Sequence, residues 1–389
     1  QVIEKPSKTD DCMDLIAKLL KVRYANKSGI IYTTTIKDTE SIRDELKKRG
    51  LKVGCYHANM EPKQRSKTYE YWMNNTYQAV VATIAFGLGI DKPDVRFVLH
   101  HSLSKSMENF YQESGRAGRD GKRSECVLLF KLSDVFKLSP MVFSTNTGIL
   151  NLYGMLEYCI DTQRCKRTII ADHFEEMWES SHCLKMCDYC ARSTKLLRTF
   201  NLLVYFPVIK KILNSSTDPM TALMLVDAWL HKGAVKYRLK DEKPPNMSRE
   251  QADAVIGWML IKGLLTEDFH FTPYNTISYI HIGSEGKVSK DQNNELLVPH
   301  SIWAKIDSNT PSPTSMENIT NDIVEIKSES LNCTKSNSLV NLKKRKIIDS
   351  DDDGDNKKLN MDDSTPINQK SDKNTLEFSP SGTIVIDDD

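Results

Sequence analysis

The sequence of 389 residues has no long apolar run and almost no net charge. No stretch approaches the roughly 20 apolar residues of a membrane-spanning helix, so we expect no membrane partner. The 53 basic and 52 acidic residues leave a formal net charge of +1, so bulk charge neither indicates nor excludes a nucleic-acid partner. Two further features are missing, namely a G-x-x-x-x-G-K-S/T phosphate loop and an acidic box that could hold magnesium.

The chain also lacks a signal peptide and opens with Gln1 instead of methionine. We therefore expect an internal start and a fragment of a longer protein. About 285 residues have a globular composition, which is enough for two or three domains with cores of their own.

Cysteine is present in an odd number and is clustered. Of nine cysteines, four form the pattern C-x17-C-x3-C-x2-C: Cys165, Cys183, Cys187 and Cys190. This usage suits a reducing compartment with a metal site better than a disulfide framework. Four thiolates at such spacing are typical of tetrahedral zinc, and because all four bonds would go to protein, we expect a structural and not a catalytic ion. Nearby Cys159 lies on an apolar stripe and is interpreted as a core residue.

Apolar runs alternate with amphipathic segments through the first part of the chain. We predict strands at 29–33, 51–56, 79–83, 95–100 and 126–130, and helices at 38–49 and 63–73. This alternation predicts an α/β domain with a parallel sheet covered on both faces. Ligands of such sheets bind at the carboxyl ends of the strands.

The stretch from Thr83 to Gly121 ends on two arginines, Arg116 and Arg119, each preceded by a glycine. On a helix their spacing puts both guanidinium groups on one face, so we predict an arginine-bearing helix at the carboxyl edge of the sheet. Glycine is costly in a helix, and close approach of a backbone or a phosphate would explain it. Two forked cations aimed at one place suit a polyphosphate. For the pair alone, a solvated basic helix with two tolerated glycines is an alternative.

Two segments of this stretch resemble helicase motifs. Residues 82–94, ATIAFGLGIDKPD, resemble the fifth motif of superfamily-two helicases in the RecQ form, and residues 111–120, YQESGRAGRD, resemble the sixth. Within the RecQ family, the phrase HHSLSKSMENFYQESGRAGRDG is most similar to the short animal enzymes of the RECQL type. The resemblance covers about residues 1–285 and implies the second RecA-like lobe of an ATP-dependent 3′–5′ DNA helicase. The missing phosphate loop would belong to a first lobe that precedes Gln1, so this chain would hold half an ATP site and be inactive alone.

The resemblance also implies roles for residues of these motifs. Arg116 and Arg119 would be the arginine fingers that reach ATP on the first lobe, and Gln112 belongs to the same catalytic motif. Gly89 and Asp91 would lie at the nucleotide with them, and Asp91 would couple the nucleotide state to the grip on DNA. A helix or turn cap before a proline is the alternative for Asp91.

Contacts with DNA are implied at two strand ends and beyond the cysteines. His57 and Thr83 occupy positions where the family's second lobe meets the DNA backbone, although each could be an ordinary strand-end residue. The cysteine spacing also resembles the RecQ zinc subdomain. After it, three helices and a hairpin describe a winged helix: helices at 202–212, 220–229 and 248–262, then strands at 264–268 and 276–282.

Two features of the winged-helix region are candidate DNA contacts. Lys232, Lys236 and Arg238 lie in a basic stretch that could contact phosphates, with a solvated helix end and turn as the alternative. In RecQ helicases of this type an aromatic residue at the wing tip wedges between the DNA strands, and Tyr274 matches that position. A tyrosine packed back on its hairpin is the alternative.

These observations divide the chain into four parts: a second RecA-like lobe at 1–147, a zinc-binding subdomain at 148–195, a winged-helix domain at 196–285 and a disordered tail at 286–389. In the tail, Lys343–Lys346 has the composition of a nuclear import signal. Residues 326–329 match a SUMO acceptor pattern, and residues 384–386 could add a strand to the SUMO sheet. A chance match is the alternative for each.

The function implied is that of the C-terminal part of a nuclear helicase that unwinds forked or junction DNA with single-stranded overhangs, in repair, recombination and replication. ATP and Mg²⁺ would bind between this lobe and the first one, and Zn²⁺ would bind in the cysteine cluster. If the chain truly starts near Gln1, the alternative is a non-enzymatic, zinc-braced DNA-binding protein. An RNA helicase would share the motor motifs but not the combination of zinc module and wing.

Overall fold

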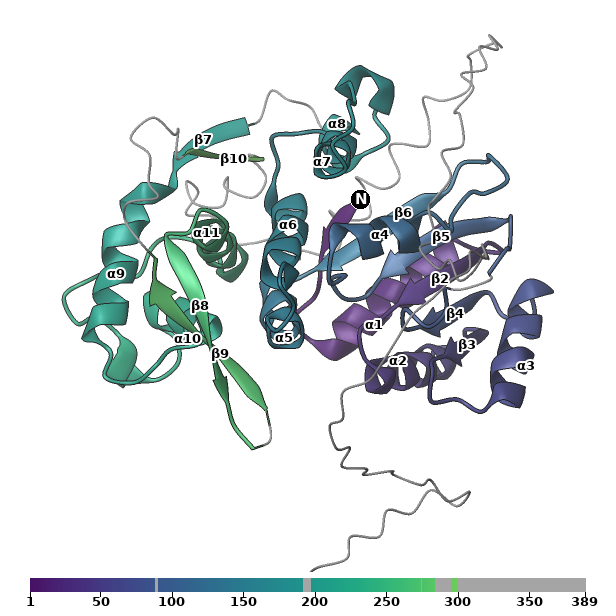
Figure 1. Cartoon of the computed structure of the whole chain (residues 1–389), viewed down its shortest axis with the longest axis horizontal. Coiled ribbons are helices and arrows are strands. Elements are labelled where there is room, and N and C mark those ends of the chain that lie inside the picture. Colours follow the sequence, from purple (N-terminus) through teal and green to yellow (C-terminus); the bar gives the residue numbers. More distant parts are fainter. Residues whose placement is uncertain (88–89, 192–196, 274, 284–294, 300–389) are drawn as a thin grey trace, which may run out of the picture. The chain divides into compact units, whose positions relative to one another are not determined.

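The computed structural model describes residues 1–87, 90–191, 197–273, 275–283 and 295–299 of the chain (Figure 1). Among these residues, no helix combines the length and the apolarity needed to cross a membrane.

The first part of the chain is a parallel sheet with helices on both faces, as the sequence predicts (Figure 1). Its six strands follow the spatial order β1-β6-β5-β2-β4-β3. The strands are β1 (Val2–Glu4), β2 (Ser28–Tyr32), β3 (Val53–Tyr56), β4 (Ala79–Ala82), β5 (Val95–His100) and β6 (Glu125–Phe130). The helices of this part are α1 (Thr9–Lys18), continued by a π-helical turn (Leu19–Arg23), α2 (Ile36–Lys48), α3 (Pro62–Met73) and α4 (Met107–Ser114).

Two separate cores hold helices α1, α2 and α3 to the sheet. Ile31 of β2 packs with residues of α1 and α2, whereas its neighbour Ile30 packs in a second cluster with Trp72 of α3. Successive side chains of a strand point to opposite faces, so an apolar run such as β2 supplies both cores. Strands β2, β4 and β5 end at one carboxyl edge of the sheet, because their last residues, Tyr32, Ala82 and His100, are register partners.

Helix α4 ends before the arginine pair, so the predicted arginine-bearing helix is wrong. Gly115 caps the helix, and the chain then forms turns that carry Arg116 and Arg119. Gly118, between them, has φ of +73°, which interrupts any helix. A Cβ atom at this glycine would lie 2.5 Å from a serine hydroxyl, so the close approach predicted for the glycines does occur here, to protein.

After β6 the chain is mainly helical. The next helices are α5 (Leu132–Val142), α6 (Gly148–Ile160), α7 (Lys166–His173), a 3-10 turn (Ser180–Cys183) and α8 (Asp188–Ala191). Then follow a 3-10 turn (Leu202–Tyr205), α9 (Phe206–Ser215), α10 (Ala222–Trp229), a 3-10 turn (Val235–Tyr237), α11 (Arg249–Ile261) and the hairpin strands β8 (Leu265–Phe271) and β9 (Thr276–Ile282). One apolar core runs through α5, α6, α9, α10 and α11.

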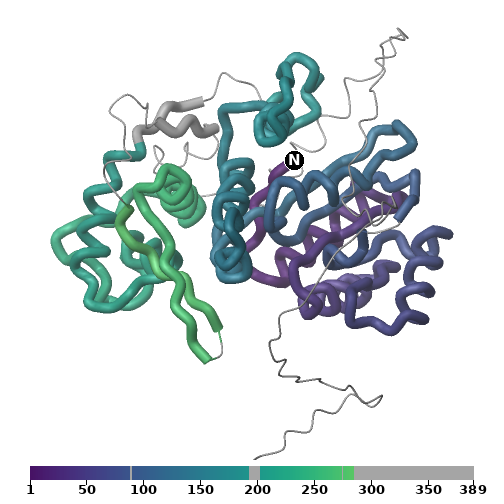
Figure 2. Tube along the Cα trace, viewed as in Figure 1, coloured from purple at the N-terminus to yellow at the C-terminus, as the bar shows by residue number. Residues whose placement is uncertain are grey.

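The order of three helices and a hairpin is the one predicted, and Figure 2 shows the hairpin as a long antiparallel pair. Its first strand reaches Phe271 and is therefore longer than predicted. Assignment of this region as a winged helix stays a prediction.

A further strand lies within the segment predicted to be disordered. Strand β10 (Glu295–Pro299) pairs antiparallel with β7 (Leu197–Asn201). The prediction of disorder from residue 286 is therefore wrong for β10. The pairing joins segments far apart in the sequence, which local composition does not reveal.

Candidate functional site

Arg116 is buried and holds the loop that follows β4. Its side chain is only 7% exposed, and Nη1 donates a hydrogen bond of 2.6 Å to the carbonyl oxygen of Gly87. The hydroxyl of Tyr32 donates to the neighbouring carbonyl of Phe86 at 2.8 Å. Two side chains from outside the loop thus fix its first half.

Arg119 contacts the second half of the same loop and is more accessible. Its Nη1 lies 2.6 Å from the carbonyl oxygen of Ile90 and 3.0 Å from Oδ1 of Asp91. The Arg119 side chain is 38% exposed and that of Asp91 is 85% exposed. An exposed ion pair contributes little free energy, so Arg119 can exchange Asp91 for another anion at small cost. Gly89, predicted to contact nucleotide, lies outside the described residues.

Backbone hydrogen bonds and one further arginine brace this arginine turn, defined here as residues 115–121. The amides of Gly118 and Asp120 donate to the carbonyls of Val95 and Pro93 at 2.9 and 3.3 Å. Arg96 pairs with the carboxylate of Asp120 at 2.7 Å, and this bond lowers the pKa of Asp120. The arginine turn is therefore joined to the segment between β4 and β5 by backbone and side-chain hydrogen bonds, and it lies beside the start of β5.

The predicted DNA-contacting residues His57 and Thr83 lie side by side at this edge. They follow Tyr56 and Ala82, which are register partners in β3 and β4. Thr83 is half-buried, whereas the imidazole of His57 is buried, with Nε2 3.4 Å from Oε1 of Glu40. The structure thus brings the two residues together, but His57 presents little surface to a ligand.

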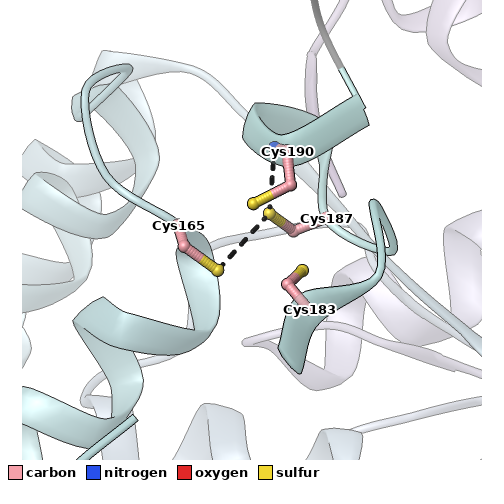
Figure 3. Close-up of side chains that lie close together, drawn as sticks. All are labelled: Cys165, Cys183, Cys187 and Cys190. Carbon is pink, nitrogen blue, oxygen red and sulfur yellow. Dashed lines mark hydrogen bonds between the residues drawn. The ribbon is translucent and has the colours of Figure 1, made fainter. Parts of the chain in front are cut away.

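The four cysteines form one cluster of sulfur atoms (Figure 3). Their Sγ atoms all lie within 4.8 Å of one another, and those of Cys165 and Cys187 are 3.8 Å apart. Tetrahedral zinc with bonds of about 2.3 Å requires sulfur–sulfur distances of about 3.8 Å, so the cluster fits this ion. The amide of Cys190 also donates to Sγ of Cys187 at 3.3 Å. Cys159 belongs to the apolar core, as predicted.

The chain forms the sulfur cluster from two short segments. Cys165 precedes helix α7, Cys183 ends the 3-10 turn at Ser180–Cys183, and Cys187 and Cys190 follow this turn. Leu184 and Lys185 both have positive φ, of 49° and 57°. These left-handed residues turn the chain sharply, so that Cys187 returns to the same point as Cys183.

The basic stretch of the helical region is partly neutralised by its own neighbours. Lys236 pairs with Asp218 at 2.6 Å, and this bond raises the pKa of Lys236 to about 12. Arg238 donates to the carbonyl of Gly233, whereas Lys232 is exposed. The structure therefore leaves Lys232 the most available of the three predicted phosphate contacts. Tyr274 lies outside the described residues.

Comparison with known proteins matches two family models to this chain. Residues 8–121 match the helicase conserved C-terminal domain, and residues 132–191, which include all four cysteines of the cluster, match the RecQ zinc-binding domain. The ATP-dependent DNA helicase Q1 of Rattus norvegicus is 42% identical over 315 residues, which cover 80% of this chain and 50% of that protein. The protein of the same name from Mus musculus is 45% identical over 286 residues, covering 73% of this chain and 44% of that protein. The chain belongs to the RecQ family.

This RecQ chain spans about half the length of the relatives it matches. Its two matched regions coincide with the two sites built above, because the arginine turn ends the first match and the sulfur cluster ends the second. The RecQ zinc-binding match and the sulfur geometry agree on zinc as the ion that the cluster suits.

Sequence reasoning missed a buried polar network under the RecQ arginine turn. Oε2 of Glu113, in α4, lies 2.9 Å from Nε2 of His100 and accepts from the hydroxyl of Ser104 at 2.7 Å. All three side chains are buried. The network fixes α4 on the end of β5 and leaves neighbouring Gln112 exposed. The signal for this network in the sequence was His100, a polar residue at the end of an apolar strand.

Proposed function

We propose that this chain supplies the second motor lobe, the zinc module and the DNA-binding module of an ATP-dependent DNA helicase. The observation that carries the proposal is the convergence of Arg116 and Arg119 on the loop after β4, which begins at the edge where such sheets bind ligands. Membership of the RecQ family and the relatives named ATP-dependent DNA helicase Q1 support it. DNA-stimulated ATP hydrolysis by the natural protein tests the proposal, and a protein that binds DNA but never hydrolyses ATP would refute it.

The two arginines would have different tasks. Bound ATP with Mg²⁺ supplies the phosphoryl group whose transfer drives the motor. Arg119 would leave Asp91 and turn to the phosphates, where a guanidinium stabilises the developing charge. Arg116, already buried against Gly87, would keep the loop in place during this exchange. The released Asp91 could then report the nucleotide state to the DNA-contacting edge.

On the DNA side, we infer a strand that runs past Thr83 at the carboxyl edge of the sheet, with Lys232 near duplex phosphates. Movement in the 3′–5′ direction and preference for forked or junction DNA follow from the family resemblance. The zinc ion would be structural, because four thiolates leave no open position for a substrate water. Roles in repair, recombination and replication belong to the same proposal.

The wing tip offers a direct test of strand separation. Replacing Tyr274 with alanine is expected to remove a stacking contact of about 1–3 kcal/mol and so to slow unwinding about five-fold or more. Binding to blunt duplex DNA should change little, because phosphate contacts lie elsewhere. Gel-based unwinding and fluorescence anisotropy measure the two quantities, and Tyr274→Trp, which keeps a ring, serves as the control. Equal loss of unwinding and binding would show that Tyr274 is not a wedge.

The tail elements proposed for nuclear import and for SUMO, Lys343–Lys346 and residues 326–329 and 384–386, lie outside the described residues. We propose a nuclear location on the basic run alone. A fluorescent fusion in which Lys343–Lys346 is replaced by alanines should lose nuclear accumulation, and unchanged accumulation would remove this signal from consideration.

A further inference from the structure

The two faces of the β8–β9 hairpin are chemically different. Glu267, Phe269 and Phe271 alternate along β8 and therefore share one face. Asp268 and His270 share the other face, where both are exposed and lie 3.1 Å apart. On the first face, Glu267 and Phe269 are half-buried against the rest of the molecule, whereas Phe271 is 76% exposed.

The Glu267 carboxylate accepts hydrogen bonds from three hydroxyl groups on three different elements. Ser139 of α5 and Tyr153 of α6 each donate at 2.7 Å, and Ser278 of β9 donates as well. A carboxylate has only acceptor sites, so each hydroxyl must be the donor. Burial, and then the charge of Glu267, raises the pKa of Tyr153, so its phenol stays protonated and able to donate. We call these four residues the hairpin clamp.

A stack of rings continues the contact beside the hairpin clamp. Phe143 stacks on Phe269 with centroids 4.5 Å apart and planes 16° apart, and its centroid lies 5.5 Å from that of Phe271. Ser139 of α5 and Phe143, which follows the last residue of α5 with a helical backbone conformation, are four residues apart, a rise of about 6 Å. Glu267 and Phe269 are two residues apart on β8, a rise of about 6.7 Å. The two spacings match, so the strand lies along the helix with both contacts in register.

The first turn of α5 is anchored to the parallel sheet. Only Lys131 separates the end of β6 from the start of α5. Asp134 in this turn pairs with Lys5, just after β1, at 2.9 Å, and both side chains are at most 10% exposed. Helix α5 is therefore held by the sheet at one end and holds the hairpin at the other.

We propose that Glu267 is a positioning residue that sets the orientation of the β8–β9 hairpin on α5 and α6, so that motion of the RecA-like lobe reaches the hairpin tip. The functional part of this inference rests on the proposed helicase activity. The orientation of the hairpin is independent of that activity, because it is argued from the contacts alone. The hydrogen bonds of the clamp and the ring stack are both directional.

Replacing Glu267 with glutamine tests the proposal, because an amide nitrogen cannot accept a hydrogen bond and part of the clamp must open. In the natural protein, amide hydrogen exchange in residues 265–273 and 275–282 is expected to accelerate on the order of ten-fold, the effect of about one lost hydrogen bond. Unwinding should slow by a similar factor, with ATP hydrolysis within about two-fold of the unchanged protein. Asp268→Asn is the matched control, since it makes the same chemical change on the opposite face of the same strand.

Hydrogen exchange and unwinding in the two variants decide whether the clamp orients the hairpin. Faster hairpin exchange in Glu267→Gln but not in Asp268→Asn supports the clamp, and equal exchange in both overturns it. Should Glu267→Gln not fold, Tyr153→Phe removes a single donor, and Tyr279→Phe, opposite Asp268 on the outer face, is its control. If the unchanged protein does not unwind DNA, the proposed function fails while the exchange comparison still decides the clamp. Faster exchange with unwinding unchanged would overturn the transmission role.

Discussion

Replacing Arg119 with alanine is expected to lower DNA-stimulated ATP hydrolysis by the natural protein about 10³-fold or more, the effect of an arginine finger in other phosphoryl-transfer enzymes. The reason lies in its setting. Arg119 is partly exposed and bound to one carbonyl and to the exposed Asp91, so it is both anchored and free to change partner. Affinity for single-stranded DNA should stay within about three-fold, because no DNA contact is assigned to this arginine. Turnover at saturating DNA and fluorescence anisotropy measure the two quantities.

Two comparisons sharpen the Arg119 result. The exposed Arg123, four residues further along, is a matched control, and Arg123→Ala should hydrolyse ATP normally. Arg116→Ala should lower the free energy of unfolding as well, by about 1–3 kcal/mol, because it leaves the Gly87 carbonyl without its donor. Unchanged turnover in Arg119→Ala would refute its assignment as a finger. A loss of stability in that variant equal to the loss in Arg116→Ala would show that both arginines are structural.

Removal of zinc is expected to have the second large effect. The free energy of zinc binding at a structural site contributes directly to the free energy of folding. In small zinc peptides this binding free energy amounts to about 10–16 kcal/mol. Replacing Cys187 with alanine should therefore abolish zinc binding and lower the unfolding midpoint by about 10 °C or more. Metal analysis should find one zinc per chain in the unchanged protein, and thermal unfolding followed by circular dichroism measures the midpoint.

The control for the zinc prediction is Cys159→Ala, since Cys159 is also buried but belongs to the apolar core. This variant should keep its zinc even if packing costs it some stability. Zinc content unaffected by Cys187→Ala, or lost equally in Cys159→Ala, would contradict the assignment of the four ligands.

The parallel sheet could be predicted because its information is local. Runs such as Gly29–Tyr32 are apolar on both faces, and that pattern has few other solutions. The sequence did not predict helix α1 or the edge strand β1. A strand of three residues, such as β1, leaves no periodic pattern. The cysteine cluster could be predicted equally well, because the type and the spacing of the ligands can be seen directly in the sequence.

The conformation of the arginine turn could not be predicted from local sequence patterns. Its two arginines do point at one place, but a loop and not a helix brings them there. The deciding feature is the positive φ of Gly118, where a side chain would collide with a serine hydroxyl and a backbone carbonyl. The role of Glu267 is similarly hidden, because Ser139 and Tyr153 lie 128 and 114 residues away in the sequence. Contacts of this kind exist only in the folded chain.

The most direct measurement is strand separation by the natural protein on a forked DNA duplex with a 3′ single-stranded tail, compared with a duplex that has only a 5′ tail. The account predicts ATP-dependent separation of the first substrate, little separation of the second, and loss of activity in Arg119→Ala. Binding of both substrates without ATP-dependent separation of either would contradict it and leave a zinc-braced DNA-binding protein.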